Sequence, residues 1–426
     1  MTEAPSPSRA QSATTWFVLH STAFLNAAGM GLAIPVLPFL AAHYALGPAR
    51  VASIVGWLET SYALCAFLAA PVLGALSDAV GRRPVLLVSI VGSAVGYALF
   101  GFAWALPLLF ASRIVDGLTA GNTSALLAYV GDRTSEEERG RAFGRMGAVA
   151  GAGFIVGPAL GGLAVRFGGL KAPFFCAAAA TALNALLGFF FLPESLPKER
   201  RKRSMPTWNP FGQLATLFAW RHVRPFLIVR VLFMAAFACV MTFPLLAKDG
   251  LGWGADKVSF VLICVGLADI LVQGLLLGFL ERVLGPTRVL ALGLGLTMLG
   301  FGGFVAVART TSASSALSVA SGAFFLAAVV ALACGEGLFT ATLTAFLSRA
   351  AGSDAQGQIQ GGNHALQELT AVAMPLAATQ LYAHCGPSAP YLAALLLTMA
   401  SALFLFRCGV RDPEASSGHA LDGSPR

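Results

Sequence analysis

The feature of this sequence that most constrains its fold is a series of long apolar runs. Residues 16–40, 51–73 and 85–103 form the first three of them. Each run reaches the roughly 20 residues that an α-helix needs to cross about 30 Å of hydrocarbon. The chain of 426 residues is 57% hydrophobic and only 11% charged, whereas an average soluble domain is roughly 25% charged. A water-soluble fold could not bury so much apolar surface, so the sequence predicts an integral membrane protein.

The expected fold class is an all-α integral membrane protein with about twelve transmembrane helices. The predicted spans are 16–40, 51–73, 85–103, 106–130, 142–165, 174–192, 225–247, 258–280, 289–308, 317–347, 363–383 and 391–409. Their pattern predicts an N-terminal six-helix bundle at 16–192 and a C-terminal six-helix bundle at 225–409, joined by a central basic cytoplasmic loop at 193–224. A disordered cytoplasmic N-terminal tail at 1–15 and a cytoplasmic C-terminal tail at 410–426 complete the expected organisation.

The basic residues indicate how the chain is oriented. With the N-terminus placed inside, only six of the 28 Lys and Arg residues fall in outside segments, and two, Arg113 and Arg230, fall within helices. This bias follows the positive-inside rule. The sequence therefore predicts a multi-pass protein of the bacterial inner membrane with both termini in the cytoplasm. Topology also accounts for the net charge of +8 without a nucleic-acid partner.

Several classes of site are not indicated. The seven cysteines have no CxxC pair or metal-ligand spacing, and the six histidines are dispersed. No G-x-x-x-x-G-K-[ST] nucleotide-binding loop is present. We therefore expect no metal, no cofactor and no enzymatic activity, and we expect any transport to draw on an ion gradient.

The most specific motif lies between the second and third predicted spans. It reads G-A-L-S-D-A-V-G-R-R-P over residues 74–84. A glycine at its start permits close helix approach, its aspartate can accept hydrogen bonds from a helix N-terminus, and its arginines hold the cytoplasmic side. The string resembles a signature of the major facilitator superfamily, and the motif residues are Gly74, Asp78, Gly81, Arg82 and Arg83.

A second motif lies in the fifth predicted span and reads G-F-I-V-G-P-A-L-G-G. Small residues at this spacing make a flat helix face, and a proline loosens one backbone hydrogen bond. Ordinary small-residue packing would give a similar pattern. The string resembles a motif of proton-coupled antiporters of the same superfamily, and its residues are Gly153, Gly157, Pro158, Gly161 and Gly162.

Ionisable residues at membrane depth are functional candidates because a charge there is costly. The fourth span carries Arg113 and Asp116 at an i,i+3 spacing, and the tenth carries Glu336 between two glycines. The arginine resembles one that the superfamily uses in proton coupling. The resemblance implies a role of Arg113 in proton coupling, and Asp116 and Glu336 are the acids that we expect to change protonation or pairing with it. A permanent ion pair and a pairing of Glu336 with Arg113 both stay open, and Glu59 and Asp269 are further candidates.

Polar residues in the spans could line a substrate cavity. His364 and Glu368 share one face of the eleventh span at an i,i+4 spacing, although they could equally form its N-terminal cap at the cytoplasmic mouth. An apolar pocket with a few polar groups is the usual form of a small-molecule site. The expected cavity residues are Asn26, Asn122, Gln273, His364, Gln367 and Glu368.

Several strings from about residue 24 to 383 are similar to those of bacterial tetracycline/proton antiporters. They are G-M-G-L-A-I-P-V-L-P at 29–38, G-R-R-P-V-L-L at 81–87, L-P-E-S at 192–195, and L-S-R with Q-G-Q-I-Q-G at 347–361. Those antiporters carry acids in helices 1, 3 and 9 for metal–tetracycline exchange. The corresponding positions here look like Asn26, Gly96 and the stretch near Gly295, so all three acids are missing.

The resemblance implies proton-coupled efflux of small amphipathic, drug-like molecules by alternating access, in the manner of multidrug efflux proteins. The missing acids make tetracycline itself doubtful, and a neutral or cationic compound is expected. The expected partners are this small-molecule substrate, protons and the lipid bilayer, with a monomer as the usual state of the superfamily. A proton symporter or facilitator that imports a nutrient or metabolite would fit the same fold.

Overall fold

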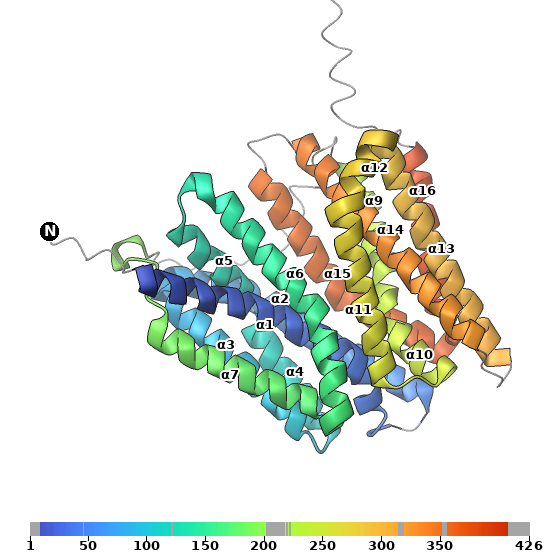
Figure 1. Ribbon diagram of the computed structural model, residues 1–426, viewed down its shortest axis with the longest axis horizontal. Coiled ribbons are helices and arrows are strands. Elements are labelled where there is room, and N and C mark those ends of the chain that lie inside the picture. The colour runs from blue at the N-terminus through green and yellow to red at the C-terminus, as the bar shows by residue number, and fades with distance from the viewer. Residues whose placement is uncertain are drawn as a thin grey trace, which may run out of the picture. The chain divides into compact units, whose positions relative to one another are not determined.

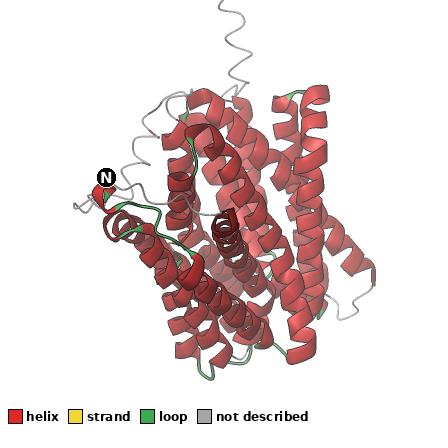
Figure 2. Ribbon diagram, turned by 60° about the vertical axis from the view of Figure 1, so that its left-hand side comes forward, coloured by secondary structure: helices red, strands yellow, loops and turns green. Residues whose placement is uncertain are grey.

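The computed structural model describes residues 9–45, 47–120, 122–201, 218, 220, 223–313, 319–351 and 356–407. Every regular element within these ranges is helical, as Figure 2 shows. The prediction of an all-α chain is therefore confirmed. The C-terminal tail and residues 202–217 of the central loop lie outside the described residues.

The first half of the chain contains seven α-helices and one short 3₁₀-helix among its described residues (Figure 1). They are α1 (Arg9–Ala41), α2 (Pro48–Val80), α3 (Arg82–Phe102), α4 (Leu106–Thr119), α5 (Asn122–Arg133), α6 (Glu136–Gly168), α7 (Ala172–Phe191) and η1 (Lys198–Arg200). Helix α1 begins inside the segment 1–15 for which the sequence predicts disorder.

The second half is also built from helices, two of which are interrupted by short non-α turns. Its elements are α9 (Arg224–Ala238), the 3₁₀-helix η2 (Cys239–Thr242), α10 (Phe243–Leu251), α11 (Ala255–Leu271), the π-helix η3 (Val272–Leu276), α12 (Leu277–Leu284), α13 (Pro286–Ala313), α14 (Val319–Ala351), α15 (Gln356–Cys385) and α16 (Ala389–Arg407).

Ten helical segments among the described residues are long and apolar enough to cross a membrane. The two other predicted spans correspond to α15 and to α4 with α5. The span predicted at 106–130 is not one helix, because α4 ends at Thr119 and α5 begins at Asn122. The span predicted at 258–280 contains the π-helix η3, and such turns occur mostly as single insertions near functional sites.

The chain divides into two compact units. Unit 1 comprises residues 1–45, 57–208 and 255–260, and unit 2 comprises residues 46–56, 209–254 and 261–426. The contacts described below each lie within one unit.

In unit 1, the glycine-rich string of α6 packs directly on the backbone of α1. A Cβ atom at Gly153 would collide with the Phe24 carbonyl oxygen, and one at Gly157 would collide with that of Ala28. A Cβ at Gly31 of α1 would lie 2.7 Å from the Phe154 carbonyl oxygen. Close backbone approach through small residues is the usual way that membrane helices associate. The small face predicted from the sequence is therefore a packing face in unit 1.

In unit 2, aromatic rings fix α9 against α14. The ring centroids of Phe233 and Phe339 are 4.0 Å apart, and those of Phe226 and Phe346 are 5.9 Å apart. All four side chains belong to one buried core cluster. These contacts set the relative positions of polar residues that lie between the rings on the same two helices.

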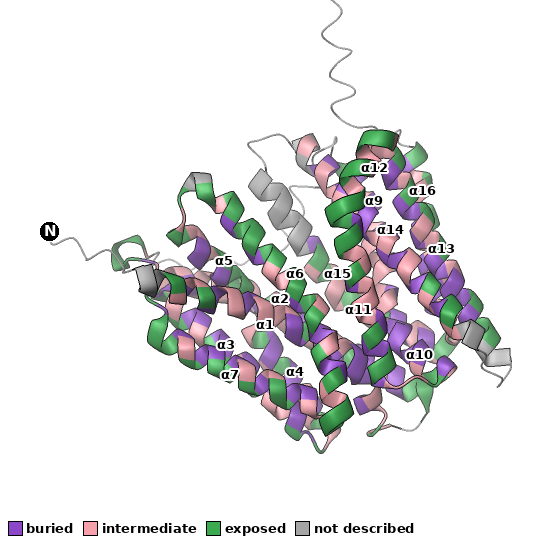
Figure 3. Cartoon of the chain, viewed as in Figure 1, coloured by how far each residue is buried: buried purple, intermediate pink, exposed green. Residues whose placement is uncertain are grey.

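Large apolar side chains also line exposed helix faces (Figure 3). On α7, Leu183, Phe189 and Phe190 are at least 58% exposed, and on α12 Phe279 and Val283 are more than 60% exposed. Surfaces of this kind would be aggregation sites in water. In a bilayer they face lipid, which is as apolar as the side chains themselves.

The contact between α1 and α6 predicts that two Gly→Ala substitutions on α6 have opposite effects on stability. Gly157→Ala should destabilise the protein by about 1–3 kcal/mol, because the new methyl group overpacks the α1 backbone. Gly151→Ala is the matched control, since a Cβ there meets nothing within 4 Å and alanine favours the helix by about 1 kcal/mol. The measurement is the midpoint of thermal unfolding in detergent. Equal midpoints for the two variants would contradict the contact.

Candidate functional site

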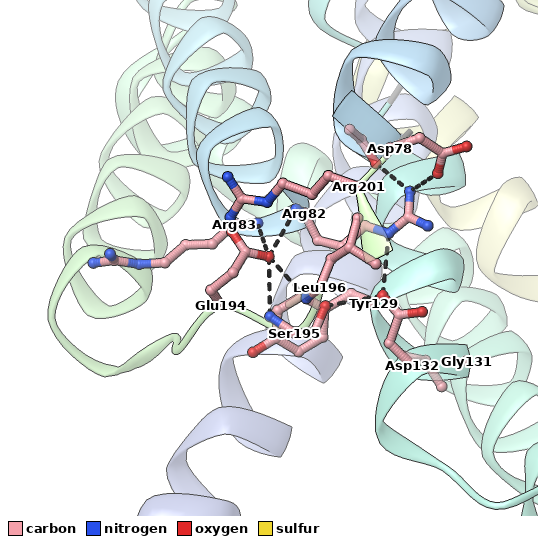
Figure 4. Close-up of polar contacts among 12 residues, drawn as sticks. Asp78, Arg82, Arg83, Tyr129, Gly131, Asp132, Glu194, Ser195, Leu196 and Arg201 are labelled. Carbon is pink, nitrogen blue, oxygen red and sulfur yellow. Dashed lines mark hydrogen bonds and ion pairs between the residues drawn. The ribbon is translucent and has the colours of Figure 1, made fainter. Parts of the chain in front are cut away.

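A cluster of charged residues surrounds the turn between α2 and α3 (Figure 4). At its centre, Glu194 Oε1 accepts hydrogen bonds from the backbone N–H groups of Arg82 at 2.9 Å, Ser195 at 3.0 Å and Leu196 at 3.1 Å. Helix α3 begins at Arg82, so the carboxylate neutralises the positive end of that helix. Glu194 Oε2 also lies 3.7 Å from Arg201 Nη2.

The side chain of Arg82 joins three helices in the same cluster. Its guanidinium pairs with Asp78 of α2, donates to Ser77 Oγ at 2.6 Å, and pairs with Asp132 of α5 at 3.1 Å. Asp132 also accepts from Ser195 Oγ at 3.1 Å. We call these residues, together with Glu194, the turn cluster. Several charges that share hydrogen bonds form a network, which holds helices more strongly than an isolated surface pair.

Other residues of the same motif have distinct roles. Gly81 has a φ of 122°, and a Cβ there would collide with Glu194 Oε2, so this position requires glycine. Arg83 Nη2 donates to the Phe189 carbonyl oxygen at 2.6 Å. A Cβ at Gly74 would meet nothing within 4 Å among the described residues, so the close helix approach expected of this glycine stays a prediction.

A second group of ionisable residues is buried in unit 1 around α4. Arg113 is 5% exposed and Asp116 is 6% exposed. The Arg113 guanidinium carbon lies 4.5 Å from the centroid of the Phe100 ring and 5.8 Å from that of Tyr62. Ring faces attract a cation electrostatically, so aromatic side chains stabilise this arginine within the apolar interior.

The carboxyl group of Asp116 is held from α3. Ser93 donates a hydrogen bond to it, and Arg113 and Glu59 are close enough to act on it electrostatically. A Cβ at Gly96 would lie 2.8 Å from the Asp116 Cβ. Asp116 therefore packs on the helix 3 position where, by resemblance, tetracycline antiporters carry an acid.

Unit 2 contains a third group of buried charges. Arg230 of α9 is 6% exposed and contacts Thr344 Oγ1 of α14 at 3.5 Å. Glu336 accepts a hydrogen bond from Thr340, one turn along α14, and interacts electrostatically with Arg230. Asp269 of α11 interacts in turn with Glu336. Arg113 and Arg230 are thus buried arginines, one in each unit, and each interacts electrostatically with a carboxyl group.

The family of the chain follows from a comparison with known proteins. The model of the Major Facilitator Superfamily matches residues 19–361, which is most of the chain. The chain belongs to the major facilitator superfamily. The resemblance inferred from the turn motif is confirmed, and members of this superfamily are transporters.

Curated relatives in the superfamily are drug-resistance proteins. The class C tetracycline resistance protein of Escherichia coli is 35% identical over 373 residues, covering 86% of this chain and 89% of that protein. The class G protein of Vibrio anguillarum is 33% identical, covering 84% and 88%. Multidrug resistance protein 2 of Bacillus subtilis is 28% identical, covering 66% and 70%.

Solved structures share the same fold at low identity. A transporter of the POT family in complex with 5-aminolevulinic acid has a TM-score of 0.71 at 14% identity and covers 93% of this chain and 96% of that one. The xylose transporter XylE of E. coli, in a partially occluded inward-open conformation, has a TM-score of 0.68 at 14% identity and covers 94% and 98%.

The residues predicted to line a substrate cavity differ in their exposure. Asn26 is half-buried on α1, Gln273 and Gln367 are exposed on η3 and α15, and Glu368 is half-buried on α15. The side chains of Asn122 and His364 lie outside the described residues. Within the described ranges, no group of three His, Cys, Asp or Glu side chains is arranged to hold a metal ion.

Sequence reasoning missed three important partners. In the sequence, Glu194 is part of the string L-P-E-S at 192–195. Its position after a predicted span does not reveal that it caps α3. Asp132 follows the fourth predicted span and shows no local motif. Arg230 stands out in the sequence as one of two basic residues within predicted spans. The sequence does not reveal that the carboxyl group with which it interacts is Glu336.

The turn cluster predicts that Glu194→Gln destabilises the protein. The amide keeps the shape but removes the charge that strengthens three backbone hydrogen bonds, at a cost of about 1–2 kcal/mol. Glu199→Gln, an exposed glutamate of η1, is the matched control and should be neutral. Thermal unfolding in detergent measures both. A midpoint for Glu194→Gln equal to that of wild type would show that the cluster does not stabilise the fold.

Proposed function

We propose that the chain is a secondary active transporter that exports small amphipathic, drug-like molecules in exchange for protons. The proposal rests mainly on Asp116, which is a buried carboxyl group beside Arg113. It also rests on similarity to tetracycline resistance proteins, one of which matches 86% of this chain. A carboxyl group within a membrane span is a functional candidate by its energetic cost alone.

The surroundings of Asp116 suit a group that gains and loses a proton. Asp116 is buried, and Arg113 and the hydroxyl of Ser93 lie beside its carboxyl group. In this proposal, a movement of Arg113 relative to Asp116 changes which form of the carboxyl group is favoured. This change couples the proton to alternating access.

The substrate class follows from the relatives and from the acids that this chain lacks. We propose a neutral or cationic compound with a large apolar part, received by apolar helix faces and by polar groups that include Asn26 and Gln273. Tetracycline complexed with a metal is less suited, because the positions that by resemblance correspond to the acids of tetracycline antiporters are Asn26, Gly96 and the stretch near Gly295, and none is acidic. The transporter requires no cofactor in this scheme, since the proton gradient supplies the energy.

The proposed setting is the bacterial inner membrane, with both termini in the cytoplasm and a single chain as the working form. The orientation rests on the Lys and Arg bias of the loops. It places the turn cluster at the cytoplasmic face, where the cluster can hold one conformation of the carrier until substrate or proton binding releases it.

Measurements in everted membrane vesicles test whether substrate export is coupled to proton movement. Addition of a transported compound should dissipate an imposed proton gradient with the wild-type chain, and Asp116→Asn should reduce the initial rate at least about tenfold, equal to ~1.4 kcal/mol in barrier height. Asp256→Asn, at an exposed position in the first turn of α11, is the matched control. Compounds should include tetracycline and several lipophilic cations. Substrate-driven proton movement that survives Asp116→Asn would reject the assignment.

The direction of transport is tested in intact cells. An efflux-deficient strain that expresses the chain should accumulate less of the compound and tolerate more of it. Proton-dependent accumulation inside the cells would instead identify an importer and overturn the export proposal.

A further inference from the structure

Asp269 differs from Glu336, the carboxyl group next to it, in its hydrogen bonding. Its Oδ1 atom is buried and has no hydrogen-bond partner among the described residues. Gln273, one turn along the chain, donates to the same carboxyl group. Gln273 lies in the π-helix η3, which begins three residues after Asp269. An acceptor buried without a partner destabilises the fold, and more strongly so when it is charged.

The close approach of α14 accounts for the burial of this oxygen. A Cβ at Gly337 would lie 3.1 Å from Asp269 Oδ1 and 3.4 Å from Gln273 Nε2. On the other flank of Glu336, a Cβ at Gly335 would lie 2.6 Å from the backbone nitrogen of Thr297 on α13. The two glycines let α14 pack tightly on both sides, and this packing places the Oδ1 atom of Asp269 against the surface of α14.

The charges around Asp269 are unbalanced. The titratable groups that face it are Glu336 and Cys334 of α14. Among the described residues, the buried cation nearby is Arg230, and it acts on Glu336. An ionised Asp269 would therefore be a second negative charge next to Glu336, and no described cation acts on it. Burial of an uncompensated charge costs several kcal/mol, and such a group normally neutralises itself by taking up a proton.

We infer that Asp269 is a second proton-binding site, in unit 2, with Glu336 as the ionised partner of Arg230. The proton resides on the Asp269 carboxyl group in the conformation described here. When the site is hydrated, the acid transfers this proton to water and leaves a carboxylate and a hydronium ion. Together with Asp116 in unit 1, the site allows two protons to be exchanged in one cycle. This role in transport rests on the proposed function, whereas the protonation itself does not.

Infrared spectroscopy of the purified full-length protein tests the protonation without a substrate. Spectra recorded across a pH series should show a carboxylic-acid C=O band from buried acids near neutral pH. Asp269→Asn should remove part of this band. Asp256→Asn, an exposed aspartate at the start of α11, should leave it unchanged. Glu336→Gln should retain the Asp269 contribution, although at a different pH, because a neighbouring charge has been removed.

Additivity tests whether the two sites are independent. The band lost in the double variant Asp116→Asn/Asp269→Asn should equal the sum of the losses in the single variants, as expected for sites in separate units. An unchanged band in Asp269→Asn would overturn the inference. So would a band that Glu336→Gln abolishes and Asp269→Asn does not, since the proton would then reside on Glu336.

Transport measurements separate this inference from the proposed function. In proteoliposomes, Asp269→Asn should lower the number of protons exchanged per substrate about twofold. If the wild-type protein exchanges no protons with any compound, the proposed function fails while the infrared result stands. If proton exchange occurs and Asp269→Asn leaves its stoichiometry unchanged, the second site fails while the proposed function stands.

Discussion

The energetic cost of charge in an apolar interior is the constraint on which the functional structure of this protein depends. Arg113 and Arg230 are each about 95% buried in helices that otherwise carry apolar side chains. Neither cation stands alone, because aromatic rings cover Arg113 and a carboxyl group accompanies each of them. A charge that must be compensated locally ties its neighbours to one arrangement. A change in proton occupancy therefore changes which arrangement is stable.

Small residues make these buried charges possible. Gly96 gives room for Asp116, and Gly337 brings α14 against Asp269 and Gln273. On α6, Gly153 and Gly157 let the backbone of α1 come into direct contact. In lipid, association of helices gains little from the hydrophobic effect and depends on such close packing. The same glycines thus serve both the stability of each unit and the geometry of its ionisable groups.

Much of the fold was predictable, because the bilayer imposes one dominant signal. Apolar runs of about 20 residues give the helices, and the all-α class is confirmed. The turn motif and the small-residue string indicated the superfamily by resemblance, and the match of the family model confirms it. The predictions were incomplete at local irregularities of the helices. Each span was predicted as one continuous helix, whereas α4 ends at Thr119 and the π-helix η3 interrupts the span that contains Asp269.

The sequence by itself determined the membrane-spanning helical class, the superfamily, and which ionisable residues lie at membrane depth. It did so because hydrocarbon thickness and the cost of charge act on local sequence. Only the tertiary structure decided which groups meet. It brought Glu336 within electrostatic range of Arg230, set Glu194 on the first turn of α3, and packed Asp116 on Gly96. These partners are separated by 20 to more than 100 residues in sequence, so their proximity is created by helix packing and leaves no trace in any one segment.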